Sequence, residues 1–335
     1  MKKKIVGLTY DVKSQYRSKK TDPEDIVAEF DQDSTIEQVN NAIASGGHEV
    51  IKIGNAQNLL RNLDILQKVD IVFNISEGLI GRNRESQVPV ILEAMNVPFV
   101  GSDGLTLALT LDKILTKKVI SYTGLPTPRF FEATTAGSLN GLPFDFPMMV
   151  KPRYEGSSKG VSDKSRVENR DRLIEQIRFV NEVYKQSALV EEFISGYEFT
   201  VPIIGNDPPL VLEIVQTEID GKLKLGDLIY TYDRIHSDKV KYVCPAKIDK
   251  ELEGHLKKMA LVTYKAVECR DFGRVDFRVD EKGNPYVLEI NPLPSLSVED
   301  VFRFEAELMG ETYNQMVNRI LDYALERYNL KKSGE

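Results

Sequence analysis

Hydrophobic and polar positions along the first hundred residues predict strands separated by helices. Apolar runs of strand length occupy residues 3–10, 48–54, 69–76 and 97–102. Apolar residues with the spacing of a helix face occupy residues 34–47 and 86–96. Strands that alternate with helices form a parallel sheet, with the functional loops at the carboxyl ends of the strands. The pattern therefore predicts an N-terminal α/β unit over residues 1–104.

Two further segments follow with a different order of elements. A helical pattern rich in lysine covers residues 110–124, and a later apolar strand delivers Lys151 to a loop of small residues. Another apolar strand begins at residue 188, and a long helix is expected over residues 306–328. These patterns predict a central segment at 105–187 and a C-terminal segment at 188–335.

The stretch GRVDFRVDEKGNPYVLEINPLP, residues 273–294, has the pattern of a hairpin with its polar groups in matching phase. Side chains two residues apart share one face of a strand, so Arg274 and Asp276 lie together. Glu289 and Asn291 share a face in the same way on the second strand. The apolar residues expected behind that face are Tyr286, Leu288 and Ile290.

A two-residue turn at Lys282 and Gly283 would place Asp276 opposite Glu289, and Arg274 opposite Asn291. Two facing carboxylates repel each other unless a positive group lies between them. A divalent cation with oxygen ligands meets that requirement. The alternative is a ladder of cross-strand ion pairs, but such ladders seldom set acid against acid.

Composition and charge narrow the classes of function. Hydrophobic residues make up 41% of the chain and charged residues 28%, as in ordinary globular proteins. The net charge of −7 argues against nucleic acid as a partner. No run of about 18 apolar residues is available to span a membrane, and no signal peptide is recognisable. Two cysteines and three scattered histidines fit neither a disulfide framework nor a zinc cluster, so we expect a cytoplasmic protein.

Two loops carry candidate nucleotide chemistry. In MMVKPRYEGSSKGV, Lys151 precedes a loop of small residues whose backbone amides can approach a phosphate, although a flexible turn has the same composition. In ALVEEFISGYEFTV, acidic residues surround a short apolar strand, which by itself also fits a solvated sheet edge. Neither stretch decides the function alone.

Taken together, these stretches resemble the ATP-grasp superfamily, and within it the D-alanine–D-alanine ligases. The matching pieces are VPFVGSD, LTLDKILTKK, MMVKPRYEGSSKGV, LVEEFISGYEFTV, YVCPA and GRVDFRVDEKGNPYVLEINPLPS, in the family's order. They span about residues 97–295. The resemblance implies a three-domain ATP-grasp fold of α/β and α+β type. Its N-terminal domain is Rossmann-like, and ATP lies between the central and C-terminal domains.

The resemblance also implies functional residues. Those expected to bind ATP are Lys113, Lys151, Ser157, Ser158, Glu191, Glu192, Phe193, Ile194, Glu198 and Arg234. Those expected to hold two Mg²⁺ ions, with Mn²⁺ as a substitute, are Asp276, Glu289 and Asn291. Catalytic roles fall to Arg274, Ser157 and Arg234. Within this assignment Glu191 binds adenine, Glu198 binds ribose, and Arg274 stabilises the acyl-phosphate and the tetrahedral intermediate.

Both amino-acid pockets depart from the family pattern. No glycine-rich turn with its glutamate follows the first strand, and SEGLIGRNRESQ replaces a loop that carries a histidine. The mobile loop has Arg234 where the family has a lysine, and His236 follows on the same loop. Asp300 replaces a serine that helps to bind the second D-alanine's carboxylate. The residues expected to bind substrate are Glu77, Arg82, Arg84, Ser295 and Asp300.

An intact set of ATP residues with altered substrate pockets predicts an ATP-dependent, ADP-forming carboxylate–amine ligase. We expect its small-molecule substrate pair to differ from two D-alanines. A genuine D-alanine–D-alanine ligase is the alternative, and an inactive nucleotide-binding protein is a second one. The resemblance further implies a homodimer with no nucleic acid or membrane partner.

Overall fold

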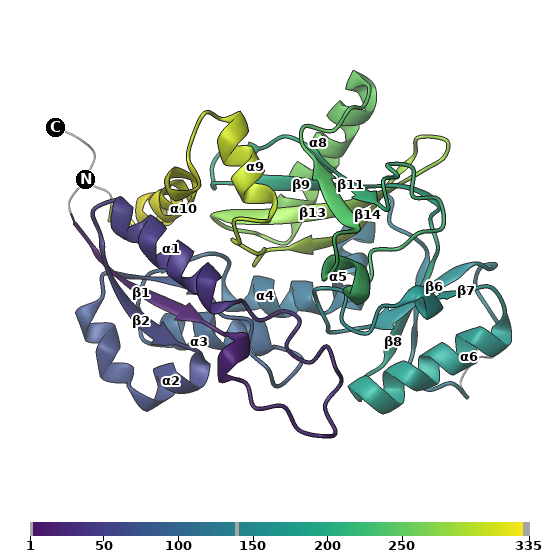
Figure 1. The fold of residues 1–335 in the computed structure, drawn as a ribbon, viewed down its shortest axis with the longest axis horizontal. Helices are drawn as coiled ribbons and strands as arrows, with labels where there is room; N and C mark the ends of the chain where they lie inside the picture. Colours follow the sequence, from purple (N-terminus) through teal and green to yellow (C-terminus); the bar gives the residue numbers. More distant parts are fainter. Residues whose placement is uncertain (1–2, 138–140, 331–335) are drawn as a thin grey trace.

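The computed structural model describes residues 3–137 and 141–330, and its strands form three sheets (Figure 1). The first sheet is wholly parallel, in the order β2-β1-β3-β4. Its strands are β1 (Ile5–Tyr10), β2 (Glu49–Gly54), β3 (Ile71–Ile75) and β4 (Phe99–Val100). The helices that connect them are α1 (Asp33–Ser45), α2 (Ala56–Arg61) and α3 (Gln87–Ala94). The strands and helices expected in the first hundred residues are therefore present and form a parallel sheet.

The second sheet is antiparallel, in the order β5-β8-β6-β7. Its strands are β5 (Phe130–Ala133), β6 (Met148–Pro152), β7 (Arg166–Val167) and β8 (Ala188–Glu192). Helix α6 (Arg170–Phe179) packs on it through Leu173 and Ile177. The predicted boundary at residue 187 separates β8 from this sheet, so a boundary after residue 192 agrees better with the strand pairing.

The third sheet has the order β12-β11-β9-β13-β14, with β10 paired to β9. Its strands are β9 (Gly196–Ile204), β10 (Leu210–Val211), β11 (Val215–Ile219), β12 (Val240–Val243), β13 (Phe272–Asp280) and β14 (Pro285–Asn291). Helices α7 (Tyr232–Ile235) and α8 (Lys250–Ala266) lie between these strands in the sequence. Helix α8 packs on the face of the sheet that carries Phe199, Val275 and Phe277.

Helices α4 (Gly104–Leu111) and α5 (Lys113–Tyr122) precede the second sheet in the chain but pack elsewhere. Helix α5 contacts β14 and α8 of the third sheet, and its Ile120 lies in that sheet's core. The predicted central segment, 105–187, therefore includes a helix, α5, that packs on the C-terminal sheet, while α4 also contacts α3 of the N-terminal unit. This exchange brings Lys113 to the edge of β14.

The chain ends in two helices rather than the one predicted over residues 306–328. These are α9 (Val301–Leu308) and α10 (Tyr313–Arg327). Gly310 between them has a φ of +72°, which ends the first helix, and Thr312 caps the second by a reciprocal pair of bonds with Gln315. Helix α10 packs on α1 of the N-terminal unit, so the core of that unit includes this last helix (Figure 1).

The hairpin of β13 and β14 has the predicted facing pairs but not the predicted turn. Asp276 lies opposite Glu289, and Arg274 opposite Asn291. The turn contains three residues, 281–283, because Asp280 pairs with Asn284. A bulge between the turn and the facing pairs restores the register.

That bulge also changes which residues face the core. Val287 is fully buried, whereas Leu288, which the two-residue turn would place there, lines a cavity. The extra residue in the turn and the bulge compensate each other, and only residues 285–288 change face.

Asp271, the residue before β13, connects segments of the chain that are distant in the sequence. Its side chain is fully buried and accepts hydrogen bonds from Gly101 N at 2.8 Å and Asn206 Nδ2 at 2.9 Å. Arg327 on α10 donates to both of its oxygens, at 2.6 and 3.1 Å. One carboxylate therefore joins the N-terminal sheet, the third sheet and the last helix.

We expect Asp271→Asn to lower the free energy of unfolding by about 3 kcal/mol, because it leaves the Arg327 guanidinium without its countercharge. Asparagine keeps the side-chain shape and tolerates the φ of +64° at this position. Urea unfolding measures the difference. Asp145→Asn, at an exposed site, is the matched control. A loss below about 1 kcal/mol would show that Asp271 is not a structural junction.

Candidate active site

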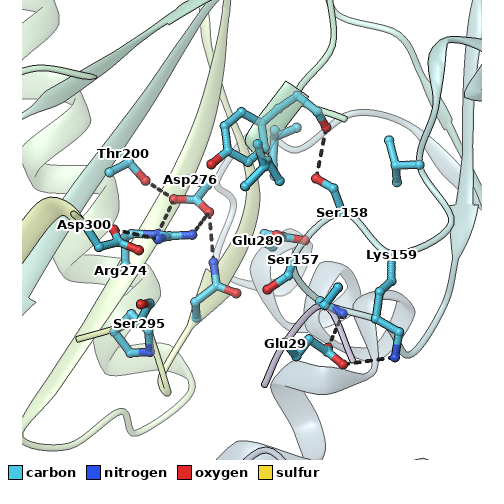
Figure 2. A pocket seen from close by; sticks show the side chains of 18 of the residues that line it. Glu29, Ser157, Ser158, Lys159, Thr200, Arg274, Asp276, Glu289, Ser295 and Asp300 are labelled. Carbon is cyan, nitrogen blue, oxygen red and sulfur yellow. Dashed lines mark hydrogen bonds and ion pairs between the residues drawn. The ribbon is translucent and has the colours of Figure 1, made fainter. Parts of the chain in front are cut away.

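A cavity of about 1190 Å³ lies where the three sheets meet (Figure 2). Its wall includes most of the residues predicted from the sequence. Those lining it are Glu77, Lys113, Lys151, Ser157, Ser158, Glu191, Glu192, Phe193, Ile194, Glu198, Arg274, Asp276, Glu289, Asn291, Ser295 and Asp300. The predicted residues that do not line it are Arg82, Arg84 and Arg234.

In this cavity each facing carboxylate of the hairpin has a cation of its own. Arg274 Nε lies 3.1 Å from Asp276 Oδ1, and Lys113 Nζ lies 2.6 Å from Glu289 Oε2. Burial opposes the ionisation of Glu289, but Lys113 and Lys151 lower its pKa to about 2. Burial raises the pKa of Asp276 above its ordinary value in spite of Arg274. The repulsion expected between the facing acids is therefore balanced by protein cations.

The same hairpin presents oxygen atoms that suit a hard divalent cation. Asn291 Nδ2 donates to Asp276 Oδ2 at 2.8 Å, so the amide is oriented with its nitrogen toward Asp276. Thr200 on β9 also donates to Asp276 (Figure 2). Two carboxylates and one amide oxygen on adjacent strands are the donor set that Mg²⁺ prefers. The residues present fit such an ion.

Asp112 aligns the two lysines of the predicted phosphate site. It is fully buried, caps α5 by accepting from Leu115 N at 3.2 Å, and so sets the start of the helix at Lys113. Arg153, two residues beyond Lys151, donates to both Asp112 oxygens at 2.6 and 2.7 Å. A bidentate pair of this kind fixes both distance and angle. The end of β6 and the start of α5 are therefore held in a fixed relation.

Glu191 is clamped between two lysines. Its oxygens lie 2.8 Å from Lys151 Nζ and 2.8 Å from Lys117 Nζ. Burial opposes ionisation, but the lysines lower the pKa of Glu191 to about 2. Lys117, 1% exposed, was not predicted as a site residue; its helical position alone carries no signal of this contact. The neighbouring Glu192 points to the surface, where it pairs with Arg129.

The loop of small residues is held from two sides. Ser157 and Ser158 adopt φ values of +45° and +56°, and Ser158 Oγ donates to Tyr230 O at 2.9 Å. On the other side, Gly156 N donates to Glu29 at 2.5 Å, and Gly160 N to Asp25 at 2.7 Å. Figure 2 shows Glu29 below the loop, beside Lys159. The backbone of the loop is therefore fixed before any ligand is considered.

Glu29 is a cavity residue that the sequence did not predict. The segment after the first strand lacks the family's glycine-rich turn, and none of its residues was among those expected to bind substrate. The structure brings Glu29 there through a long irregular connection that begins after β1. Such a connection has no periodic pattern, so the sequence carried no signal of where Glu29 would lie.

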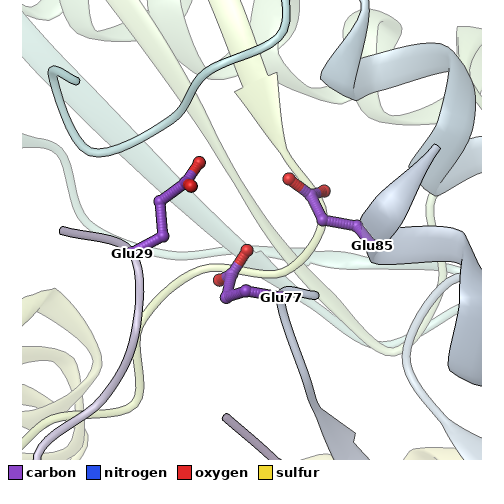
Figure 3. A group of neighbouring side chains, drawn as sticks. All are labelled: Glu29, Glu77 and Glu85. Carbon is purple, nitrogen blue, oxygen red and sulfur yellow. The ribbon is translucent and has the colours of Figure 1, made fainter. Parts of the chain in front are cut away.

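Glu29, Glu77 and Glu85 form an acidic cluster, with one carboxylate oxygen of each within 4.8 Å of the others (Figure 3). Burial raises the pKa of Glu77 well above its ordinary value and that of Glu85 to about 7. Glu29 has Arg84 and Lys159 as partners, which lower its pKa to about 2 against the effect of burial. The cluster therefore has fewer cations than carboxylates.

Two predicted substrate arginines are engaged within the protein. Arg84 is 4% exposed, and its guanidinium pairs with Glu29 and Glu85. The Arg82 side chain is exposed. Its Nη2 lies 3.4 Å from Asp112 Oδ2, and its guanidinium lies over the Tyr154 ring. Neither lines the cavity, so a direct contact of this arginine pair with a substrate carboxylate is not supported by their positions.

Arg234 on α7 is also turned away from the cavity. It pairs with Asp163 at 2.5 Å and donates to Ile229 O at 3.0 Å. Arg234 therefore does not line the cavity in this arrangement. His236 and Lys241 from the same region do line the cavity, although the His236 side chain is exposed and its Nδ1 lies 3.0 Å from Tyr232 O.

Asp300 and Ser295 lie at the end of the cavity beside Arg274 (Figure 2). Asp300 accepts from Val301 N at 2.7 Å at the start of α9, and it lies 3.6 Å from Arg274 Nη1. Ser295 Oγ accepts from Ser297 N at 3.1 Å. Arg274 therefore has one acid on each side, Asp276 and Asp300.

Comparison with known proteins agrees with this arrangement. The family described as "D-ala D-ala ligase C-terminus" matches residues 119–322. The D-alanine–D-alanine ligase of Carboxydothermus hydrogenoformans is 33% identical over 303 residues, covering 87% of this chain and 93% of that protein. The protein y4sG of Sinorhizobium fredii is 35% identical over 294 residues, covering 86% of each chain.

Solved structures show the same fold. The D-alanine–D-alanine ligase from Bacillus anthracis complexed with ATP has a TM-score of 0.72 at 23% identity, covering 98% of this chain and 99% of that one. The VanG D-Ala:D-Ser ligase from Enterococcus faecalis has a TM-score of 0.73 at 20% identity, covering 96% and 100%. At these identities the likeness concerns the fold alone.

The fold and the cavity between its sheets define an ATP-grasp protein of the carboxylate–amine ligase class, whose members are ATP-dependent and ADP-forming. Within that class, the chain belongs to the D-alanine–D-alanine ligase family. Among the described residues, no helix is both long and apolar enough to cross a bilayer.

The raised pKa values of the cluster predict how stability depends on pH. Glu85 is protonated in the folded state up to about pH 7 but ionises at ordinary acidic pH when unfolded. Its contribution to stability is therefore complete at low pH and is lost as the pH rises toward 7.

We expect the free energy of unfolding of the ligand-free protein to lose about 1–3 kcal/mol from this source between pH 5 and pH 7.5. Glu85→Gln should flatten the pH profile over that range, measured by urea unfolding at each pH. Glu175→Gln, at an exposed position, should leave it unchanged. A Glu85→Gln profile parallel to that of the wild type would contradict the assignment.

Proposed function

We propose that this chain is a carboxylate–amine ligase that forms an amide bond through an acyl-phosphate, with a substrate pair other than two D-alanines. The observation that carries the proposal is the cavity itself. The cavity is lined by the residues that the resemblance assigns to ATP and metal, and it also contains the acidic cluster of Glu29, Glu77 and Glu85 beside the loop of small residues.

The nucleotide would lie along the wall between the second and third sheets. Lys113 and Lys151 suit the phosphates, since both ammonium groups point into the cavity from fixed elements. The stretch from Glu191 to Ile194 suits the adenine, and Glu198 the ribose. Asp276, Glu289 and Asn291 would hold Mg²⁺, which supplies charge neutralisation to the phosphoryl oxygens when bound.

The proposed reaction consists of two nucleophilic steps. A carboxylate oxygen of the first substrate attacks the γ-phosphorus, and the bond to the bridging oxygen breaks to release ADP. The nitrogen of the second substrate then attacks the acyl carbon, loses a proton, and the carbon–oxygen bond breaks to release phosphate. Arg274, held by Asp276 and Asp300, would stabilise the oxyanion that forms when the nitrogen attacks and collapses when phosphate leaves. The buried wall of the cavity limits hydrolysis of the intermediate.

The acidic side of the cavity points to a substrate that carries an ammonium group. Glu77 and Glu85 have raised pKa values because burial is not offset by enough cations, so a bound ammonium would supply the missing charge. Asp300 places a further carboxylate beside Arg274. An acceptor that needs its own carboxylate at Asp300 would be repelled there.

Two alternative functions can be distinguished from the proposed one by the assay described below. Relatives named D-alanine–D-alanine ligase favour that reaction, with the acidic residues serving the amino group of the first alanine. A nucleotide-binding protein without ligase activity is less well supported, because a protein that only binds ATP has little use for Arg274. ATP consumption and the substrate class favour the cytoplasm as the site of action.

Phosphate release from magnesium-ATP tests the function directly. The panel contains D- and L-amino acids, diamines and basic amino acids, singly and in pairs, with products detected by mass. We expect stimulation by a pair that includes a compound with an additional ammonium group. Turnover with D-alanine alone would favour the first alternative, and release without any amide product would favour the second.

We expect Glu289→Gln to reduce magnesium-dependent turnover about 100-fold or more, because it removes one charged ligand of the proposed ion. The apparent affinity for Mg²⁺ should fall as well. Glu281→Gln, in the exposed turn of the same hairpin, is the matched control. Turnover and magnesium dependence equal to those of the wild type would remove the metal assignment.

A further inference from the structure

Arg278 is a buried charge to which neither the phosphate contacts nor the metal site assigns a role. It follows Arg274 and Asp276 on the cavity face of β13 and is 5% exposed. A guanidinium removed from water to this extent needs partners, because the desolvation of a charge is costly. The identity of those partners indicates its function.

Three groups hold Arg278 in place. The register pairs it directly with Glu198 on β9, and its Nε lies 3.1 Å from Glu198 Oε2. Its Nη2 donates to Leu228 O at 2.6 Å. Its guanidinium carbon lies 5.6 Å from the centre of the Phe193 ring. The planar fork of arginine makes such an arrangement directional, which a lysine would not reproduce.

Glu198 and Glu191 differ in how their oxygens are used. Both oxygens of Glu191 are taken by lysines. Arg278 makes its shortest contact with Glu198 at Oε2, and no hydrogen bond from a residue in the described ranges 3–137 and 141–330 reaches Oε1. Both acids line the cavity. Glu198 therefore keeps one acceptor oxygen for a ligand, and Arg278 opposes the burial that raises the pKa of this carboxyl group.

Resting on the proposed ATP-dependent function, we propose that Arg278 is a positioning residue that makes the nucleotide site selective for ribose over deoxyribose. It holds Glu198 Oε2, so that Oε1 accepts hydrogen bonds from the ribose hydroxyls. A hydrogen bond from a hydroxyl to an ionised carboxylate is stronger than one to a neutral acceptor. An analogue that lacks a hydroxyl leaves the acceptor unpaired and binds less well.

A purely structural role is the competing explanation, since Arg278 also joins β9 to β13. The two roles predict different effects of substitution. Loss of a structural tie would lower stability and weaken all adenine nucleotides by the same factor. Loss of a positioning contact would weaken ATP more than its deoxy analogues, because only ATP presents both hydroxyls.

The test compares the dissociation constants of ATP, 2′-deoxy-ATP and 3′-deoxy-ATP, measured with Mg²⁺ by calorimetry on the full chain. We expect the wild type to bind ATP about tenfold more tightly than at least one deoxy analogue. In Arg278→Met that preference should fall to about threefold or less, mainly through loss of ATP affinity. Arg278→Lys should recover part of it by restoring the charge.

Arg166→Met is the matched control. Arg166 also lies over the Phe193 ring, at 5.1 Å, but it pairs with Glu168 and Asp227 and does not line the cavity. Its substitution should leave the preference for ATP unchanged. If Arg278→Met does not fold, Arg278→Gln, which keeps a donor for Leu228 O, carries the same expectation.

The outcomes separate this inference from the proposed function. A wild-type protein that binds no adenine nucleotide would overturn both. A wild type that binds ATP and both deoxy analogues equally would overturn only the role of Arg278. A folded Arg278→Met or Arg278→Gln variant that keeps the wild-type preference would do the same, as would an equal loss of preference in Arg166→Met.

Discussion

The facing carboxylates of Asp276 and Glu289 are the constraint on which the rest of the site depends. Two acids across adjacent strands are unfavourable without countercharges, and the fold supplies one to each. Lys113 reaches Glu289 because α5 packs on the edge of the third sheet, away from its neighbours in the sequence. Arg274 reaches Asp276 from the same strand face. Under the proposed function, a cation that binds both acids would free these two groups to contact a substrate.

Charge balance divides the cavity into two halves. Near the second sheet, Glu191 has two lysines and is ionised, and Asp112 holds the elements that carry Lys113 and Lys151 in a fixed relation. In the acidic cluster with Glu29, Glu77 and Glu85 have too few cations and raised pKa values. Near the second sheet, cations of the protein itself balance the carboxylates. Around Glu77 and Glu85, positive charge is lacking. A ligase that takes its nucleotide on one side and a cationic substrate on the other accounts for this difference.

Chain connectivity explains why the site needs all three sheets. The segment after β1 brings Asp25 and Glu29 to the loop of small residues, while α10 packs on α1 and returns to β13 through Asp271. Each wall of the cavity is therefore braced by an element distant in the sequence. A contact of the same kind joins strands β9 and β13, where the buried guanidinium of Arg278 pairs with Glu198.

Local pattern alone determined the parallel N-terminal sheet, the strands of the hairpin and the facing of Asp276 with Glu289, because alternation along a strand is a property of neighbouring residues. The order of motifs determined the family. The bulge before Glu289 and the break between α9 and α10 depended on turn and cap geometry, which a periodic pattern does not specify. Only the tertiary structure turned Arg84 and Arg234 toward protein acids and away from the cavity, and brought Glu29 into it. The physical reason is that ion pairs and hydrogen bonds between distant segments are chosen by packing and burial, and neither leaves a regular mark on the sequence.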